Sequence, residues 1–434
     1  MPIAFIEQAH KQAGRRHHNC VYNPLVVMWL LVVQRLHGGA PLETAVIELL
    51  NLPASFWPRP CKRIREWQEQ GKLLSSYPGA YHQARQALSL SVVQKSCDRI
   101  FEELIARTAG TGPELATRAF VLDGSSMRMA YSPSMSQHFP AGSNQHGENH
   151  WPVMRVLVMH DLRTGLAVRP EWGPMNGPDA VSEQYLLEKA IGRLPASSTV
   201  IGDANFGVFS VAYAGQRNGH PVLLRLTRVR AQCLAGKKLQ DGMDVPIVWK
   251  PSRDDRRSHP GLPADACVRG RLIVRQVKPS NGAEPFLLAL FVTLPCAESE
   301  ILDLYGQRGT IETDLRTLKT HLCLEQLTCS TPEMAAKDIE MSMAAYNLVR
   351  ALICLASEQS GIPPRGYSFS KVQRIIQAFT PKLAAAADPQ EAKRIFDQMM
   401  YYVQQAKLPN RRRKRPSYPR GVWNKGAKHP HRHK

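Results

Sequence analysis

Residues 305–319 constrain the fold of this chain most, because their spacing predicts a helix with two different faces. At about 100° per residue, a tyrosine, a glutamate and three cations share one narrow stripe: Tyr305, Arg308, Glu312, Arg316 and Lys319. The neighbouring stripe is apolar and suits burial against a sheet; it carries Leu304, Ile311, Leu315, Leu318 and Leu322. The ordinary alternative is a solvated face of ion pairs. We expect one anchored face and one that presents a carboxylate among cations.

Two further acids each follow a short apolar strand candidate. Residues 120–122 lead into Asp123, and residues 199–202 lead into Asp203. An aspartate in such a place usually belongs to a turn or a helix cap. If the two strands are neighbours and Glu312 reaches over them, the three carboxylates form a site for two hard divalent cations. Such a site can activate an attacking oxygen and stabilise a leaving oxygen at a phosphodiester.

The middle of the chain follows the element order of an RNase H-like core. Three strand candidates, a helix, a fourth strand and a second helix succeed one another at 118–124, 153–160, 166–172, 179–192, 199–203 and 206–218. Before them the apolar spacing is helical, and after them come strand candidates at 245–250, 269–277 and 285–294. The sequence therefore predicts an α/β protein with an RNase H-like mixed sheet and a β-rich insertion, flanked by helical N-terminal and C-terminal regions.

Five regions follow from this pattern. A helical N-terminal region is expected at 1–115, and the first part of the core at 116–226. The insertion follows at 227–296, and the second part of the core, with the glutamate helix, at 297–360. A helical C-terminal region with a basic tail is expected at 361–434.

The charge of the chain implies a polyanionic partner. The formal net charge is +20 over 434 residues, which most economically indicates nucleic acid, although an acidic membrane surface has the same sign. No acid follows Asp397, and the segment beyond residue 410 is rich in arginine and lysine. A second acid-free run lies between Asp203 and Asp241. We expect the tail to contact nucleic acid; a purely solubilising tail has the same composition.

Cysteine usage and hydropathy indicate the compartment. The nine cysteines form no C-x-x-C pair, so we expect reduced thiols, mostly buried, and neither a disulfide framework nor a zinc finger. The longest apolar run, residues 24–33, is too short to cross a bilayer, and residues 1–20 lack a signal-peptide core. The expected protein is cytoplasmic, nucleoid-associated and not bound to a membrane.

The spacing Tyr305-x2-Arg308-x3-Glu312-x6-Lys319 resembles the YREK signature of bacterial cut-and-paste insertion-sequence transposases of the DDE class. That resemblance implies a catalytic, metal-binding triad of Asp123, Asp203 and Glu312 that holds two Mg²⁺ ions, with Mn²⁺ as a substitute. It also implies that the tyrosine, arginine and lysine of the motif contact DNA, and Arg316 on the same stripe would join them. The N-terminal region would bind DNA ends.

The same resemblance implies the partners and the reaction. Double-stranded DNA would be bound both as the ends of a mobile element and as the target, by a homodimer in the DNA complex. The enzyme would cleave with water and then join strands with the liberated 3′ hydroxyl. Some relatives stack a flipped base on a tryptophan of the last insertion strand. Residues 285–293 contain no tryptophan, which leaves Trp249 as the candidate and a packed strand tryptophan as its alternative.

Two other classes of protein fit parts of the same sequence. Another RNase H-like nuclease, such as a junction resolvase, would use three or four acids but would not need the row of Tyr305, Arg308 and Lys319. A DNA-binding protein derived from a transposase would keep the basic surfaces and lose catalysis.

Overall fold

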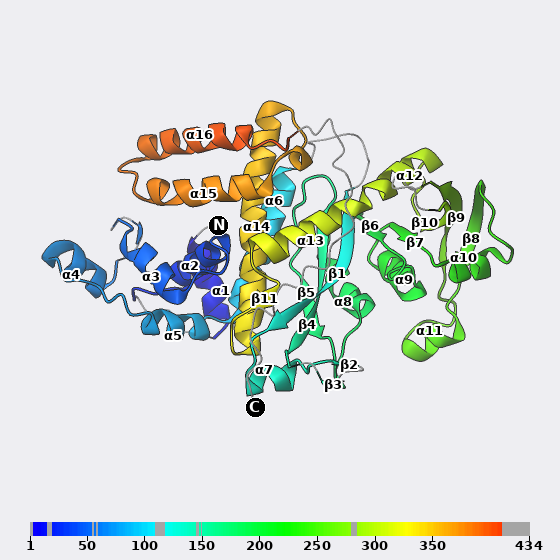
Figure 1. Cartoon of the computed structure of the whole chain (residues 1–434), viewed down its shortest axis with the longest axis horizontal. Helices are drawn as coiled ribbons and strands as arrows, with labels where there is room; N and C mark the ends of the chain where they lie inside the picture. Colours follow the sequence, from blue (N-terminus) through cyan, green and yellow to red (C-terminus); the bar gives the residue numbers. More distant parts are fainter. Residues whose placement is uncertain are drawn as a thin grey trace.

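The structure is a computed structural model, and it describes residues 3–14, 20–53, 56–57, 60–108, 118–144, 147–148, 150–278 and 284–409. A nine-stranded sheet runs from the middle of the molecule to its right-hand end in Figure 1. The strands are β1 (Ala119–Met129), β4 (Val153–Asp161), β5 (Glu171–Pro174), β6 (Thr199–Gly202), β7 (Val222–Arg225), β8 (Met243–Trp249), β9 (Val268–Val277), β10 (Phe286–Val292) and β11 (Gln326–Leu327). A separate pair consists of β2 (Ser143–Asn144) and β3 (Gly147–Glu148).

The strand order is β5-β4-β1-β6-β7-β10-β9-β8, and β11 pairs with the end of β1. Strand β1 is parallel to β6, and β6 is parallel to β7. Among the first five strands of this order, only β4 is antiparallel to the strands beside it, which are β1 and β5. This mixed α/β arrangement is that of the predicted RNase H-like core. The third strand begins later than predicted, because His160 and Ala167 form only an isolated bridge and β5 starts at Glu171.

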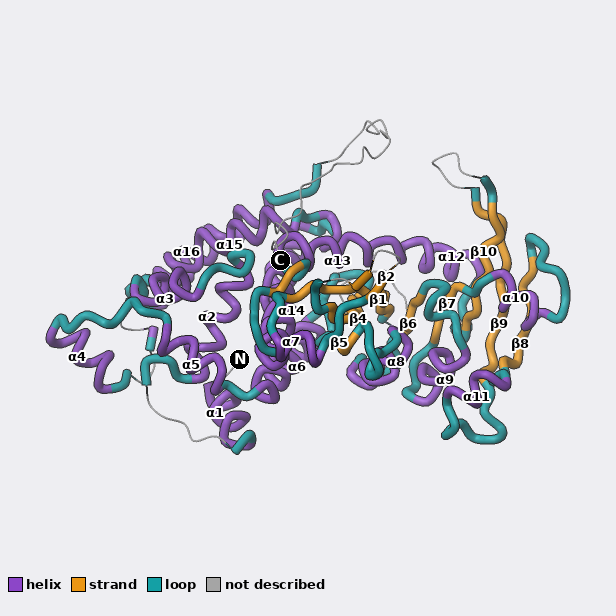
Figure 2. The backbone as a smooth tube through the Cα atoms, turned by 60° about the horizontal axis from the view of Figure 1, so that its bottom comes forward, coloured by secondary structure: helices purple, strands orange, loops and turns teal. Residues whose placement is uncertain are grey.

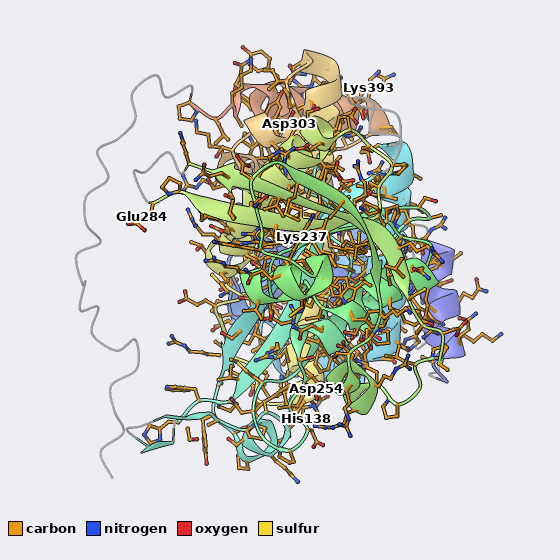
Figure 3. All side chains as sticks on the ribbon, turned by 90° about the vertical axis from the view of Figure 1, so that its right-hand side faces the viewer. His138, Lys237, Asp254, Glu284, Asp303 and Lys393 are labelled. Carbon is orange, nitrogen blue, oxygen red and sulfur yellow. The ribbon has the colours of Figure 1, made fainter. Side chains whose placement is uncertain are left out.

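Strands β8, β9 and β10 extend the same sheet as an antiparallel set. They follow two short helices, α9 (Phe209–Arg217) and α10 (Arg228–Ala235), and α11 (Arg253–Ser258) lies between β8 and β9. Figure 3 looks at this end of the molecule, where Lys237 lies near the centre of the view and Glu284 near the edge. The segment between the fifth strand and the glutamate helix therefore lengthens the sheet instead of forming a separate layer.

Helices cover both faces of the sheet. Because side chains alternate along a strand, Val121 and Met127 of β1 lie in one apolar core with α13 (Thr310–His321). Phe120 and Leu122 lie in the other core with α8 (Glu183–Ala190) and α9. Figure 2 shows α12 (Glu298–Gly306) and α13 running along one side of the sheet. This layer puts the predicted glutamate helix over β1.

Helix α14 (Pro332–Ser360) is a long helix in the middle of the molecule (Figure 1). It packs on α2 (Pro24–Leu36), α6 (Leu90–Arg107), α15 (Phe369–Ala384) and α16 (Pro389–Gln405). The remaining helices are α1 (Ile3–Gln12), α3 (Leu42–Leu50), α4 (Lys62–Gln70), α5 (Gly79–Ala87) and α7 (Pro133–His138). The part of residues 1–108 that the structure describes contains helices and loops and no strand.

Buried charges fix α14 in place. Asp338 accepts a hydrogen bond from Arg85 at 3.1 Å, and Glu340 accepts one from Arg169 at 3.2 Å. In the described part of the chain, α14 is the one helix long and apolar enough to cross a membrane, and 78% of its apolar window is buried inside the protein, as in a core helix. All nine cysteines are free; Cys20, Cys233 and Cys323 are exposed, so burial of the thiols is less complete than predicted.

Candidate active site

Asp123 and Asp203 occupy matching positions on neighbouring parallel strands. Val121 of β1 pairs with Ile201 of β6, and each aspartate comes two residues later in its strand direction. Asp203 directly follows the last residue of β6, where its Oδ1 accepts a hydrogen bond from the backbone N–H of Asn205 at 2.9 Å. Both carboxylates are half-buried. The structure therefore brings together the two aspartates that the strand pattern predicted.

Burial and neighbouring charges both affect the Asp123 carboxyl. Burial raises the pKa of Asp123 to about 6, and the charges of Asp203 and Glu183 act in the same direction. The N–H of Gly124, which donates to Asp123 Oδ1 at 2.9 Å, and the Arg308 guanidinium act in the opposite direction. Asp123 and Asp203 are therefore close enough for the charge of one to affect the pKa of the other.

The glutamate helix is not continuous, which corrects the prediction of one helix over 305–319. Helix α12 ends at Gly306, a 3₁₀ turn covers Gln307–Gly309, and α13 begins at Thr310. Two glycines flank the break, and glycine costs about 1 kcal/mol in a helix interior. A 3₁₀ turn has about 3.0 residues per turn, so the angular count across these three residues is shifted. Tyr305 is consequently buried instead of sharing the exposed stripe.

The apolar stripe is buried as predicted. Leu304, Ile311, Leu315, Leu318 and Leu322 all belong to the core between α13 and the sheet. Burial of a leucine or isoleucine contributes roughly 1.5–3 kcal/mol, so this face anchors the helix firmly. On the opposite face, the side chain of Glu312 is 65% exposed, Arg316 is exposed and Lys319 is half-buried.

Arg308 lies between the aspartates and Glu312. Its Nη2 is 3.9 Å from Glu312 Oε1, and its side chain is only 20% exposed. Its charge also acts on Asp123 and on the hydroxyl of Tyr305, which is buried near Arg225 and makes no hydrogen bond of good geometry. Burial raises the pKa of Tyr305, so this tyrosine stays protonated. Arg308 therefore lies close both to Asp123 on the sheet and to Glu312 on α13.

The three predicted carboxylates do not form a closed metal site in this conformation. In the part of the chain that the structure describes, no three acidic, histidine or cysteine side chains converge closely enough to hold a metal ion. Asp123 and Asp203 are together, whereas Glu312 points to solvent. The donor chemistry nevertheless fits a hard divalent cation, because the side chains at this place offer carboxylate oxygens and no sulfur or imidazole.

Sequence reasoning missed Asp314, which anchors α13 from its buried side. Asp314 is fully buried and accepts hydrogen bonds from Arg350 at 2.7 Å, from Arg365 at 2.6 and 2.7 Å, and from the Tyr346 hydroxyl at 3.0 Å. Burial alone would raise the pKa of Asp314, but the arginines outweigh it and hold that pKa below its usual range. The partners lie 32 to 51 residues away in sequence, so no local pattern reveals them.

The structure also corrects the assignment of Trp249. This side chain is 4% exposed and packs edge-on against Phe209 and Phe291, with centroids 6.1 and 4.9 Å away. It is therefore a core residue, and a nucleobase cannot stack on its ring. The exposed aromatic residue of the insertion is instead Phe286, the first residue of β10, which is 39% exposed and lies 5.4 Å from the Arg225 guanidinium.

The strand order and the paired aspartates define the class of this protein: an RNase H-like protein with an acidic site at the centre of its sheet. The family model described as Transposase DDE domain matches residues 114–348, more than half of the chain, so the protein belongs to this transposase family. DDE transposase domains generally use divalent metal ions. No curated protein matches the sequence.

Proposed function

We propose that this protein is an insertion-sequence transposase that binds the terminal repeats of a mobile DNA element and cuts and joins the strands. The observation that carries the proposal is the matching position of Asp123 on β1 and Asp203 just after β6, two neighbouring parallel strands beside the helix that bears Glu312, in a chain of the DDE transposase family. Water is the first nucleophile at the element end, and the freed 3′ hydroxyl is the second. The YREK spacing supports membership of the hairpin-forming group.

Asp123, Asp203 and Glu312 are the proposed ligands of two Mg²⁺ ions, for which Mn²⁺ can substitute. When bound, such ions lower the pKa of the attacking water or hydroxyl and stabilise the negative charge of the leaving oxygen. Glu312 has to turn inward from its exposed position, and this requires it to leave Arg308. The two charged atoms are 3.9 Å apart and the Glu312 side chain is exposed; an i, i+4 ion pair of this kind contributes only about 0.5 kcal/mol, so this movement costs little.

The cations of α13 and its preceding turn hold the DNA. Arg308, Arg316 and Lys319 face the same side as Glu312 and would contact phosphates near the cleaved bond. The Tyr305 hydroxyl is protonated and buried near Arg308, so it would donate a hydrogen bond to a phosphate that the arginine binds. These contacts position the strand, while the carboxylates carry the chemistry.

The partners proposed for the protein follow from its charge. The net charge of +20 supports binding of double-stranded DNA, both element ends and target. The resemblance to cut-and-paste transposases adds the proposal of a homodimer in the DNA complex. The N-terminal region would recognise the ends, and we propose a cytoplasmic, nucleoid-associated location. The basic tail, residues 410–434, lies outside the described residues.

Cleavage of DNA that carries the flanking ends of the element tests this proposal. Asp123→Asn, Asp203→Asn and Glu312→Gln should each abolish strand cleavage while end binding in a gel shift is preserved. Asp303→Asn, at an exposed position of α12, is the matched control and should cut normally. A triad variant that cuts at the rate of the unaltered protein would remove its residue from the triad.

A further inference from the structure

The turn that follows β6 carries Asp203 and packs closely against the sheet. The Phe206 side chain is fully buried, and a Cβ added at Gly202 would lie 2.7 Å from the Cβ of Phe206. Gly207 is also buried, and a Cβ at this position would lie 2.0 Å from the backbone oxygen of Arg225, the last residue of β7. Only glycine at position 207 allows the turn to approach β7 so closely.

Arg230 of α10 binds the backbone of this turn. Its Nη1 donates a hydrogen bond to the carbonyl oxygen of Gly207 at 2.6 Å, and the arginine is half-buried. A charged donor forms a stronger hydrogen bond than a neutral one, and partial burial strengthens the bond further. Gly207 follows Asp203 by four residues, so this contact restrains the same turn that carries the aspartate.

Helix α10 is itself fixed to the sheet, so it can support the turn. Thr227 caps the helix, and its hydroxyl oxygen accepts a hydrogen bond from the N–H of Arg230 at 3.4 Å. The N–H of Leu226 donates to the carbonyl oxygen of Ala289 in β10 at 2.9 Å, and Ala231 is fully buried. Arg230 therefore extends from a helix whose position is set by a strand of the insertion.

Helix α8 holds the same turn through groups at the surface. Gln184 Nε2 donates to the backbone oxygen of Asn205 at 2.7 Å and to its Oδ1 at 3.0 Å. The side-chain nitrogen of Asn205 donates to Glu183 Oε2. Because these bonds are exposed, water competes for the same donors and acceptors. Solvent replaces the half-buried bond from Arg230 less easily.

We propose that Arg230 is a positioning residue of the active site, which holds the turn after β6 so that the Asp203 carboxylate keeps its place near Asp123. This inference rests on the proposed function, because it assumes that Asp203 is catalytic. Arg230 belongs to the acid-free run between Asp203 and Asp241, and its hydrogen bond to Gly207 gives this cation a role within the protein. The insertion then helps to set the geometry of the active site.

Single-turnover cleavage of end DNA by the full-length protein tests the inference. Arg230→Ala should slow cleavage at saturating DNA by about ten- to a hundredfold, while affinity for the ends in a gel shift and the unfolding temperature stay nearly unchanged. Arg230→Gln should recover part of the rate, because its amide can also donate to the Gly207 carbonyl. Arg228→Ala removes the same charge from an exposed position of the same helix and should cleave at the normal rate.

Hydrogen–deuterium exchange provides a second readout that needs neither DNA nor a metal ion. In Arg230→Ala, the amides of residues 205–208 should exchange faster, because opening of the turn then costs less free energy. The amides of β6 and β7 should stay protected. Arg228→Ala should show the exchange pattern of the unaltered protein.

The other outcomes would overturn the inference. Exchange or cleavage that is unchanged in Arg230→Ala would show that Arg230 does not position Asp203. Equal losses of cleavage and end affinity would make Arg230 a DNA contact, and faster exchange throughout β6 and β7 would make it a support of the whole fold. In these cases the proposed function stands. If Asp203→Asn cuts DNA at the normal rate, the proposed function falls together with this inference.

Discussion

Asp314 and Arg350 share a 2.7 Å hydrogen bond in the core, and this pair joins the helix that bears Glu312 to the central helix α14. Arg365 approaches the same carboxylate from beyond the end of α14. His160 is nearby, with its Nδ1 3.8 Å from Asp314, but burial lowers the pKa of His160 to about 4, so it is neutral at pH 7. The two arginines are therefore the cations that balance Asp314.

Asp314→Ala should destabilise the protein severely. Removing one partner of a buried charge pair costs about 3–5 kcal/mol, because the remaining charges are left without compensation in the core. Chemical denaturation measures the change in the free energy of unfolding. Asp303→Ala, at an exposed acid on the preceding helix, should leave stability unchanged. Equal stability of the two variants would show that the buried cluster does not hold α13.

Glu340 should make stability depend on pH. Burial raises the pKa of Glu340 to about 7, although Arg169 beside it acts in the opposite direction. A pKa that is raised in the folded state means that folding favours the protonated acid. This contribution to stability is complete below about pH 4.5, the ordinary value for the group, and is lost as pH rises through 7.

Glu340→Gln should remove this dependence, since the amide cannot ionise. The difference in unfolding free energy between the variant and the unaltered protein should grow in favour of the variant between pH 5 and pH 8, by up to about 1.4 kcal/mol per pH unit. Glu358→Gln, at an exposed position of the same helix, should follow the unaltered protein throughout. A pH-independent difference for Glu340→Gln would contradict the assignment.

Phe286 and Trp249 should respond in opposite ways to substitution by alanine. Trp249→Ala removes a core side chain and should cost about 3–5 kcal/mol of stability. Phe286→Ala should leave the melting temperature nearly unchanged, because the ring is partly exposed. Stacking of a base on an aromatic ring is worth about 1–3 kcal/mol, so Phe286→Ala should weaken binding to ends with an unpaired base. Unchanged binding would exclude Phe286 as a stacking surface.

Much of the fold could be predicted because it depends on local periodicity. Residues 199–202 form a strand that ends just before Asp203, and the leucine stripe of α13 is buried as the helical spacing requires. The expected strand end at Asp123 was wrong, because β1 continues to Met129 and Asp123 lies inside it. The position of Trp249 could have been recognised as well. It is in phase with Ile247 on β8, and both are buried while Val248 between them is exposed.

Features that depend on tertiary contact could not be predicted. In the sequence, Glu183 resembles an ordinary acid in the first turn of a helix, where a negative charge interacts favourably with the helix dipole. Only the structure shows that its carboxylate lies against Gly124 of β1. The break between α12 and α13 has a weak local signal in Gly306 and Gly309, but the direction in which Tyr305 then turns depends on the core.

Removal of the tail tests its proposed contact with DNA. Deleting residues 411–434 should weaken binding to unrelated DNA and reduce the slope of log K against log salt by about 0.9 for each phosphate that the tail no longer neutralises. The measurement is a set of binding isotherms at increasing salt concentration. A slope equal to that of the full-length protein would mean that the tail only aids solubility.

Arg308→Ala and Lys319→Ala should impair the complex with cleaved or hairpin ends more than the first capture of duplex DNA. Both cations lie on the side of Glu312, and Arg308 is close enough to Asp123 to act on its charge. They can therefore meet only those phosphates that have already reached the carboxylates, whereas capture depends on the N-terminal region and the tail. Lys393→Ala, at an exposed position of α16, is the control cation and should change neither step.

The expected size of the effect follows from the strength of the contact. A charge-assisted hydrogen bond to a phosphate is worth roughly 1.5–3 kcal/mol, so each alanine variant should reduce the population of the cleaved-end complex by about tenfold or more. Gel shifts with intact and pre-cleaved ends separate the two steps on the same protein preparation. If both variants bind intact and pre-cleaved ends more weakly in equal proportion, the cations form a general DNA-binding surface. They would then act before the carboxylates engage the strand, and the exposed side of α13 would serve capture instead of catalysis.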